Sequence, residues 1–283
     1  MTYVAPSNAS TPVVYAPPPT DGGEGAVRLV CTPPSGSLFP IGTTFVECRA
    51  TDSLDRSGAC AFPITVFAPA TLTRTRFMAF GDSITAGEVT VPVVTPSGLF
   101  TREVQVLSAA YPTVLQQLLR ARYPNQSESI LVYNNGKGAE AAEFALQRFL
   151  DTYNLENPTA VLLMEGYNDI CCGNGIVGVE KAAAAVGEMA YLARLRGARV
   201  FIATLAPAKP GFRANHPDMI NLVNLRYRAL AQAEGAVLVD VYSALLPDVE
   251  HNLGIDGLHP TEIGYRRIAE AFYASITREL QIP

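Results

Sequence analysis

Four short segments of the chain contain residue types that can act together in nucleophilic catalysis. The first is Gly81-Asp82-Ser83, a tight turn of small residues that could hold the serine hydroxyl exposed. A serine hydroxyl is a weak nucleophile by itself and needs a neighbouring base. The turn differs from the G-x-S-x-G elbow, because Thr85 stands where the second glycine would be. A helix N-cap at Asp82 or Ser83 also explains this segment when it is taken alone.

A base is available in the second segment, where Asp256 precedes His259 by three residues. On a compact turn, such an aspartate can accept the hydrogen of imidazole Nδ1 and leave Nε2 free to take a proton from another group. The alternative is a loop histidine in front of a helix that starts with Pro260.

The third and fourth segments offer hydrogen-bond donors for a negatively charged oxygen. Asn168 carries a neutral side-chain amide, which suits an oxyanion, although many asparagines only cap helices or form turns. Residues 134–140 contain Gly136 and Gly138, whose backbone can turn amide hydrogens outward at the start of a helix. An ordinary strand-to-helix loop is the alternative for this segment.

Strands and helices alternate in the part of the chain that carries these segments. Short apolar runs predict strands at 76–80, 130–133, 160–164, 200–205 and 236–241, and helical spacing predicts helices at 111–123, 139–150, 179–195, 218–234 and 262–280. This alternation predicts a parallel sheet with helices on both faces, and such sheets bind ligands beyond the carboxyl ends of their strands. All four segments fall on that side, so we expect their side chains to meet there.

Taken together, the four segments resemble the conserved blocks of the SGNH (GDSL-type) hydrolase family, which is named after its Ser, Gly, Asn and His. The resemblance covers residues 76–280. It implies an α/β fold with three layers (α/β/α), a flavodoxin-like parallel sheet. It also implies Ser83 as the nucleophile, His259 as the general base and Asp256 as the residue that orients the base.

The same resemblance implies an oxyanion hole with three donors. Two of them would be the backbone N–H of Ser83 and the side-chain amide of Asn168. In chain order, Ser83, residues 134–140, Asn168 and His259 mark the family's first to fourth blocks. The third donor would be a backbone N–H of the second block, where the family's glycine falls at Ala139, with Gly138 one residue earlier. Both residues therefore stay candidates for this donor.

The family's chemistry is acyl transfer through the serine, which requires no cofactor and no metal. Its members act on simple esters, acylated sugars, lysophospholipids and thioesters. Because the chain has no Trp, it lacks the side chain that stacks most strongly on sugars. We therefore expect a short-acyl carboxylesterase, ahead of a carbohydrate acetylesterase or a lysophospholipase.

The first 70 residues have a different composition, rich in Pro, Gly, Thr and Val, with strand-like runs at 26–31, 43–50 and 60–67. We therefore predict two domains, residues 1–70 and residues 71–283.

Residues 31–52 and 58–66 resemble the hyalin-repeat (HYR) module, an immunoglobulin-like β-sandwich found on extracellular proteins. This resemblance covers about residues 10–68, without the family's opening strand. It implies an accessory unit that could contact carbohydrate or a surface. The alternative to an enzyme is an adhesion or carbohydrate-binding protein, in which the HYR-like module carries the function and the hydrolase domain is degenerate.

The cysteines indicate the cellular compartment in which the protein functions. We prefer a disulfide between Cys31 and Cys48, although Cys48 and Cys60 would also lie opposite each other across a hairpin, and free thiols are a further alternative. A disulfide in a β-rich module favours an exported protein whose leader has been removed. For the adjacent Cys171 and Cys172, we expect two reduced side chains.

Composition excludes several partners. The net charge is −5 and no run of Lys and Arg occurs, so nucleic acid is not expected to bind. No apolar stretch approaches the roughly 20 residues that span a bilayer.

The connection over residues 88–109 has no obvious structure of its own, and we expect it to act as a binding segment or lid beside the acyl pocket.

Overall fold

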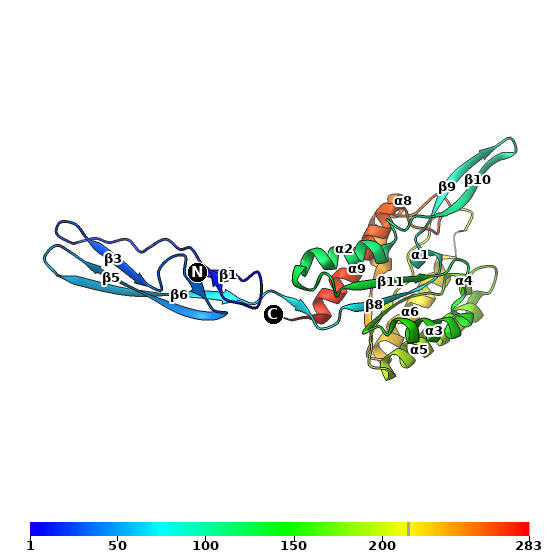
Figure 1. The fold of residues 1–283 in the computed structure, drawn as a ribbon. Coiled ribbons are helices and arrows are strands. Elements are labelled where there is room, and N and C mark those ends of the chain that lie inside the picture. The colour runs from blue at the N-terminus through cyan, green and yellow to red at the C-terminus, as the bar shows by residue number, and fades with distance from the viewer. Residues whose placement is uncertain (214–215, 283) are drawn as a thin grey trace. The chain divides into compact units, whose positions relative to one another are not determined.

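The computed structural model describes residues 1–213 and 216–282. The chain forms two compact units (Figure 1). One unit comprises Met1–Thr71 with Ile282, and the other comprises Leu72–Gln281.

The first unit is built from strands, as its composition predicts. Its main sheet has the order β1-β6-β5-β3, with the bounds β1 (Thr2–Val4), β6 (Ser57–Phe67), β5 (Gly42–Thr51) and β3 (Arg28–Thr32). A second pair consists of β2 (Thr11–Pro12) and β4 (Leu38–Phe39). Buried Tyr15, Phe39 and Val46 belong to its apolar core. Strand β1 pairs in parallel with β6, so the expectation that an opening strand is missing was wrong. A run of three residues is too short to be recognised from its pattern.

Three cysteines of this unit lie side by side on three neighbouring strands. Cys48 on β5 is opposite Cys31 on one side and opposite Cys60 on the other. The structure forms the disulfide between Cys31 and Cys48, which confirms the preferred pairing, and leaves Cys60 as an exposed thiol.

The second unit is a parallel sheet between two layers of helices, which confirms the predicted fold class. The sheet has the order β11-β8-β12-β13-β14, with the bounds β8 (Arg76–Gly81), β11 (Leu131–Gly136), β12 (Ala160–Met164), β13 (Arg199–Ala203) and β14 (Val237–Val239). All four neighbouring pairs are parallel. Every residue of β12 is buried, as expected for a strand that is covered on both faces.

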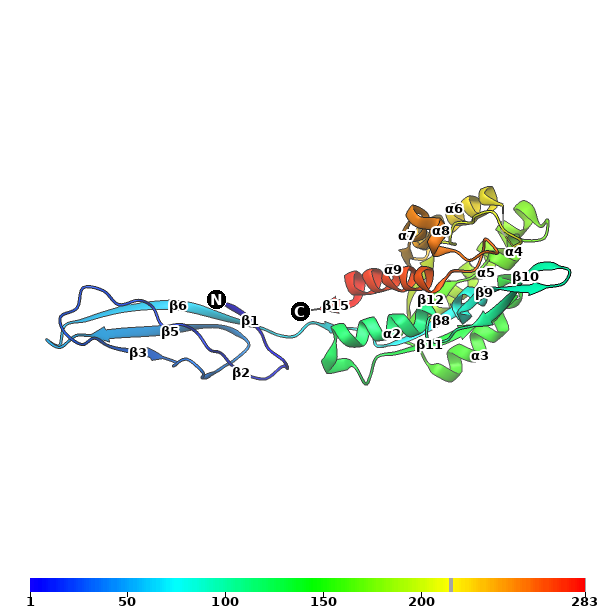
Figure 2. The ribbon, with the colours of Figure 1, turned by 90° about the horizontal axis from the view of Figure 1, so that it is seen from above.

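Long helices cover both faces of this sheet (Figures 1 and 2). Helices α2 (Tyr111–Arg122) and α9 (Glu262–Leu280) form one layer, and α3 (Leu146–Glu156), α5 (Gly175–Leu195) and α6 (Pro217–Ala233) form the other. Shorter elements of this unit are α1 (Ser83–Ala86), η1 (Pro124–Gln126), η2 (Ala142–Phe144), α4 (Tyr167–Ile170), α7 (Val241–Leu245), η3 (Leu246–Asp248) and α8 (Val249–Asn252). Two short strands, β7 (Thr71–Leu72) and β15 (Gln281–Ile282), span the bounds of the two units. In the part of the chain that the structure describes, no helix has the length and apolarity to cross a bilayer.

The strand order fixes where a ligand site can form. Strand β8 is the first of these five strands in the chain, yet it lies inside the sheet between β11 and β12. The chain passes from β8 to β11 on one side and from β12 to β13 on the other, so the direction of the connections reverses between β8 and β12. The carboxyl ends of these strands border the crevice in which doubly wound sheets bind ligands. The first, second and third catalytic blocks of the sequence follow β8, β11 and β12 respectively.

The connection after Ser83 is more regular than the sequence led us to expect. It forms an antiparallel hairpin of β9 (Glu88–Thr95) and β10 (Gly98–Gln105), which extends from the second unit (Figures 1 and 2). The expectation of a segment without structure of its own was therefore wrong. Valines at alternate positions and the turn Pro96-Ser97-Gly98 were the overlooked signal of a hairpin.

Candidate active site

The nucleophile candidate lies directly after the central strand β8. Asp82 caps helix α1, because its carboxylate accepts a hydrogen bond of 3.0 Å from the backbone N–H of Ile84. Ser83 is the first residue of that helix, so its own N–H has no partner within the helix. Gly81 is required here, since a Cβ at this position would lie 2.2 Å from the carbonyl oxygen of Met164. The N-cap and the serine are thus two aspects of one turn, but the expectation of an exposed serine was wrong, because Ser83 keeps only 7% of its surface exposed.

Three of the predicted site residues form a linear chain of hydrogen bonds. The Nε2 atom of His259 lies 2.9 Å from the Oγ atom of Ser83, and Nδ1 of the same ring lies 2.6 Å from Oδ2 of Asp256. The serine and the histidine are 176 residues apart in the chain. This is the geometry in which an imidazole can take a proton from a hydroxyl while a carboxylate orients the ring.

The carboxylate of Asp256 is held in its ionised form. Burial alone would raise its pKa, but hydrogen bonds, first of all from His259, lower the pKa to about 2. Its other oxygen accepts backbone hydrogen bonds of 3.1 Å each from Leu258 and His259. The residue therefore stays negative at neutral pH and cannot rotate away from the imidazole.

The second and third blocks are joined to each other at the same edge of the sheet. Nδ2 of Asn168 donates a hydrogen bond of 2.9 Å to the carbonyl of Glu140, which leaves its second N–H for another acceptor. The carboxylate of Asp169 accepts from the backbone N–H groups of Ala142 and Glu143 at 2.8 and 3.1 Å. These bonds begin η2 at Ala142, so the helix predicted from residue 139 starts later and is divided into η2 and α3.

The turn that carries the two remaining donor candidates has a constrained backbone. Ala139 has φ of 58°, a left-handed conformation that costs energy for any residue with a side chain. No hydrogen bond joins the N–H of Gly138 or Ala139 to another described residue. Either N–H is therefore available to an anion, and the choice between the two stays a prediction.

Arg148 supports this edge of the sheet, although no motif of the sequence pointed to this residue. Its guanidinium lies 3.9 Å from the centre of the Phe80 ring and donates hydrogen bonds to the carbonyls of Asn135 and Gly81 at 2.8 and 3.2 Å. It also pairs with the buried carboxylate of Glu140. Burial would raise the pKa of Glu140, but Arg148 and then Lys137 hold it below the usual range. Arg148 therefore ties the ends of β8 and β11 to the second block.

Two buried carboxyl groups belong to the ends of neighbouring strands: Asp82 caps the serine helix, and Glu165 follows β12. Burial raises the pKa of Asp82 to about 7, although the N–H of Ile84 opposes the shift. Burial also raises the pKa of Glu165, and the charge of Asp82 adds to that rise. No described residue forms a hydrogen bond with either carboxylate oxygen of Glu165, and the nearest cation, Arg148, is 3.8 Å away. Burial therefore shifts both acids toward the protonated form, relative to an exposed carboxyl group.

Glu88 is a further residue of the site that the sequence analysis missed. It is the first residue of β9, and its Oε2 lies 4.0 Å from Nε2 of His259. The other carboxylate oxygen, Oε1, lies 2.4 Å from the point where a side chain on Gly138 would begin. Its position five residues after Ser83 was visible in the sequence, but only the hairpin directs it back toward the histidine.

One other expectation and one recurring motif can be compared with the structure. The structure joins Cys171 and Cys172 by a disulfide, so the expectation of two reduced side chains was wrong. The loop between α4 and α5 places Cys172 at φ of 61°, a local conformation that the residue types do not reveal. The spacing of Asp256 and His259 recurs at Asp248 and His251, which form a similar hydrogen bond of 2.7 Å but are both exposed.

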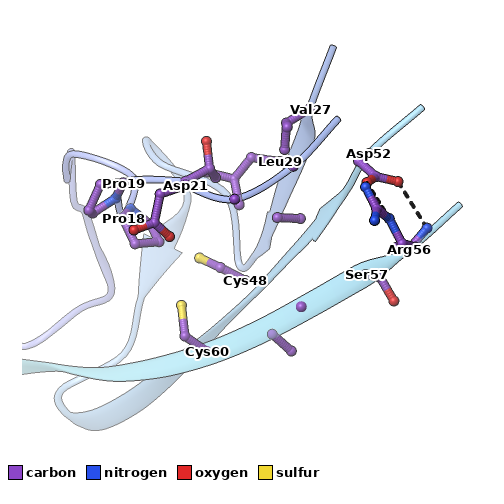
Figure 3. Close-up of a pocket in the computed structure, with 16 residues that line it drawn as sticks. Pro18, Pro19, Asp21, Val27, Leu29, Cys48, Asp52, Arg56, Ser57 and Cys60 are labelled. Carbon is purple, nitrogen blue, oxygen red and sulfur yellow. Dashed lines mark hydrogen bonds and ion pairs between the residues drawn. The ribbon is translucent and has the colours of Figure 1, made fainter. Parts of the chain in front are cut away.

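A hollow of about 450 Å³ lies in the first unit, away from these residues (Figure 3). Pro18, Asp21, Leu29 and Cys60 are among the residues that line it. The most buried charge there, Asp52, is already used by its own turn, because it accepts hydrogen bonds from the backbone N–H groups at positions 54 and 56. The hollow therefore offers no comparable catalytic arrangement.

Comparison with known families identifies both parts of the chain. Residues 79–267 match the model of the GDSL-like Lipase/Acylhydrolase family, and residues 1–66 match the HYR domain. The chain belongs to the GDSL-like lipase/acylhydrolase family and is a hydrolase of that class, with an HYR module at its N-terminal side. A comparison with curated proteins gives no match.

Solved structures share the fold of the second unit. A lipase/acylhydrolase from Enterococcus faecalis is 21% identical, with a TM-score of 0.59 over 73% of this chain and 97% of its own. The acetylxylan esterase Axe2 from Geobacillus stearothermophilus is 17% identical, with a TM-score of 0.56 over 72% of this chain and 94% of its own. Another acetyl xylan esterase is 23% identical, with a TM-score of 0.55 over 70% of this chain and 98% of its own.

Proposed function

We propose that the second unit hydrolyses short-acyl carboxylic esters through an acyl-enzyme on Ser83. The observation that carries this proposal is the chain of hydrogen bonds from Ser83 Oγ through His259 to Asp256, at 2.9 and 2.6 Å. A serine bonded in this way gains a base within reach of its proton. Membership of a hydrolase family and the likeness to esterase folds support the same reaction.

The first half of the reaction transfers the acyl group to the enzyme. Oγ of Ser83 attacks the ester carbonyl carbon while Nε2 of His259 takes the hydroxyl proton. The tetrahedral oxyanion is bound by the N–H of Ser83, the free N–H of the Asn168 amide, and the N–H of Gly138 or Ala139. When the intermediate collapses, His259 gives the proton to the leaving alcohol, and the acyl group remains on Ser83.

The second half releases the acid. Water attacks the acyl-enzyme while His259 again takes the proton, and the same donors bind the second oxyanion. Asp256 stays ionised throughout, because its pKa of about 2 lies far below neutral pH. It stabilises the imidazolium that forms in both halves and does not itself take a proton.

A panel of p-nitrophenyl esters tests the reaction and the acyl preference together. We expect hydrolysis of the acetate and butyrate, and a lower kcat/KM for the octanoate. Ser83→Ala should reduce kcat/KM by roughly 10⁴-fold or more, as when a nucleophile is removed from a triad. Labelling by a fluorophosphonate, located at Ser83 by mass spectrometry, would identify the nucleophile independently of turnover.

Ser129→Ala provides a matched control for the loss of a hydroxyl. The Ser129 hydroxyl donates a hydrogen bond to the carbonyl of Gln126, outside the site. This variant should keep the activity of the parent protein and its labelling. If Ser83→Ala keeps appreciable turnover, or if the label appears on another residue, the proposed mechanism is wrong.

We also propose that the protein works in an oxidising compartment. The support is the Cys31–Cys48 disulfide in the HYR module. Counting thiols in the unfolded protein, after isolation from its native compartment without reductant, tests this. A count of five free thiols, one for each Cys of the sequence, would contradict the proposal.

A further inference from the structure

The carboxylate of Glu88 lies beside the catalytic histidine and is not used by the reaction described above. Its Oε2 is 4.0 Å from Nε2 of His259, and this same nitrogen is 2.9 Å from the Ser83 hydroxyl. Its side chain keeps 23% of its surface exposed, so a ligand in solution can reach it.

The backbone of Glu88 is fixed, so this position does not depend on a flexible loop. The carbonyl of Glu88 accepts a hydrogen bond of 2.5 Å from the hydroxyl of Tyr265, a fully buried residue of α9. The preceding Gly87 ends helix α1 at φ of 89°. A Cβ at Gly87 would lie 2.5 Å from that of Ala110, so only glycine allows the hairpin to leave the serine turn at this angle.

The absence of a side chain at Gly138 makes room for the carboxylate. A Cβ at Gly138 would lie 2.4 Å from Oε1 of Glu88, so any other residue there would displace the acid. Glu88 therefore lies between the histidine and the turn of the second block. Among residues 1–213 and 216–282, no Lys or Arg pairs with Glu88 and no group donates a hydrogen bond to its side chain. Its acceptor positions remain available to a substrate.

The role of His259 decides which half of the ester meets Glu88. In the proposed function, on which this inference rests, Nε2 of His259 gives its proton to the oxygen of the leaving alcohol. A group close to Nε2 must therefore lie beside the alcohol half of the ester and not beside the acyl chain. An ionised carboxylate in that place accepts hydrogen bonds but cannot donate them, and it repels other anions.

We propose that Glu88 selects the alcohol half of the substrate: it binds a free hydroxyl next to the ester bond. The site then favours monoacyl esters of neutral polyhydroxylated alcohols over esters of simple alkanols, and it discriminates against esters whose alcohol carries an anionic group. The hydroxyl donates its hydrogen to the Glu88 carboxylate, while the ester oxygen faces Nε2 of His259. No covalent change occurs at Glu88, which acts by binding alone.

Three acetate esters that differ only in the alcohol test this assignment. Glycerol monoacetate has a neighbouring hydroxyl, propyl acetate has none, and O-acetylglycolate carries a carboxylate. Acetate release gives kcat/KM for each. A hydrogen bond to a charged group predicts roughly tenfold preference of the parent protein for glycerol monoacetate over propyl acetate.

Two variants of Glu88 should change these ratios in different ways. Glu88→Ala should reduce the preference for glycerol monoacetate over propyl acetate to about twofold or less; because this preference is a ratio of two kcat/KM values, a rate change common to both esters cancels. Glu88→Gln keeps the size of the side chain and removes its charge, so hydrolysis of O-acetylglycolate should rise roughly tenfold. Since Tyr265 bonds to the backbone of Glu88, both variants keep that contact.

Glu103→Gln is the matched control, because Glu103 is a carboxylate of the same hairpin that pairs with Arg213 at 2.5 Å. This variant should keep all the ratios of the parent protein. If both Glu88 variants keep the parent ratios as well, Glu88 does not select the alcohol, although the proposed ester hydrolysis still holds. If the parent protein hydrolyses none of the three esters or the p-nitrophenyl acetate, the proposed function and this inference are both overturned.

Discussion

Replacing Asn168 by Ala tests the oxyanion hole, because it removes one donor from a known position. Nδ2 of Asn168 uses one hydrogen for the carbonyl of Glu140 at 2.9 Å, so a single N–H remains for the oxyanion. Loss of one such donor lowers kcat by about 10²–10³, or roughly 2.7–4 kcal/mol of transition-state stabilisation. Since the donor acts mainly in the transition state, KM should change little.

The same substitution has a small cost in stability that can be calculated separately. It removes the hydrogen bond to Glu140, which is worth about 1 kcal/mol. For a unit of this size, that loss corresponds to a decrease of about 2–4 °C in Tm. A fall in kcat without unfolding at the assay temperature would therefore report on chemistry and not on the fold.

Asn174→Ala controls for this structural cost. Nδ2 of Asn174 donates a hydrogen bond of the same length, 2.9 Å, to the carbonyl of Asp169. Its loss should lower Tm by a similar amount and leave kcat within about twofold. Initial rates on p-nitrophenyl acetate and thermal melts of both variants make the comparison. If kcat of Asn168→Ala equals that of Asn174→Ala, Asn168 is not an oxyanion donor.

Three further substitutions follow from the structure. Asp256→Asn should lower kcat by roughly 10²–10⁴, since an amide no longer stabilises the imidazolium, and it should harm less than His259→Ala; a stronger effect than His259→Ala on p-nitrophenyl acetate would show that the roles are wrongly assigned. Burial raises the pKa of Glu165, so its contribution to stability is present at low pH and is lost as pH rises through the folded-state pKa. Glu165→Gln should therefore raise Tm at pH 8 and reduce the decrease in Tm between pH 5 and pH 8; an unchanged pH dependence in thermal melts would contradict this. Ala139→Gly should stabilise the protein by about 0.5–1 kcal/mol, because glycine adopts positive φ without the cost that alanine has at 58°; a lower midpoint in urea unfolding would be evidence against that strain.

The fold was largely predictable because its signals are local. The apolar runs that predict strands at 76–80 and 160–164 coincide closely with β8 and β12, and the helix predicted at 262–280 matches α9 residue for residue. The errors lie where a long-range contact overrides the local pattern. The helix expected from residue 139 begins later, because Asp169 of another block binds the backbone N–H groups at its start.

The active site shows that a sequence motif alone does not identify a catalytic residue. An aspartate three residues before a histidine occurs twice, and both pairs form short hydrogen bonds, of 2.6 Å at His259 and 2.7 Å at His251. Only His259 reaches a serine and is buried, whereas His251 lies on the surface. The spacing therefore predicts that the aspartate and the histidine are hydrogen-bonded. Only the fold determines which of the two histidines lies beside Ser83.

By itself, the sequence determined the features that depend on a few adjacent residues: the turn and cap at Ser83, the Asp256–His259 pair, the succession of strands and helices, and the order of the four blocks. Only the tertiary structure decided which groups surround the reacting atoms. Glu88 and Arg148 belong to the site because a hairpin and a helix bring them there, through contacts with residues 171 and 67 positions away. Such contacts depend on the path of the whole chain, and no local pattern of residue types encodes them.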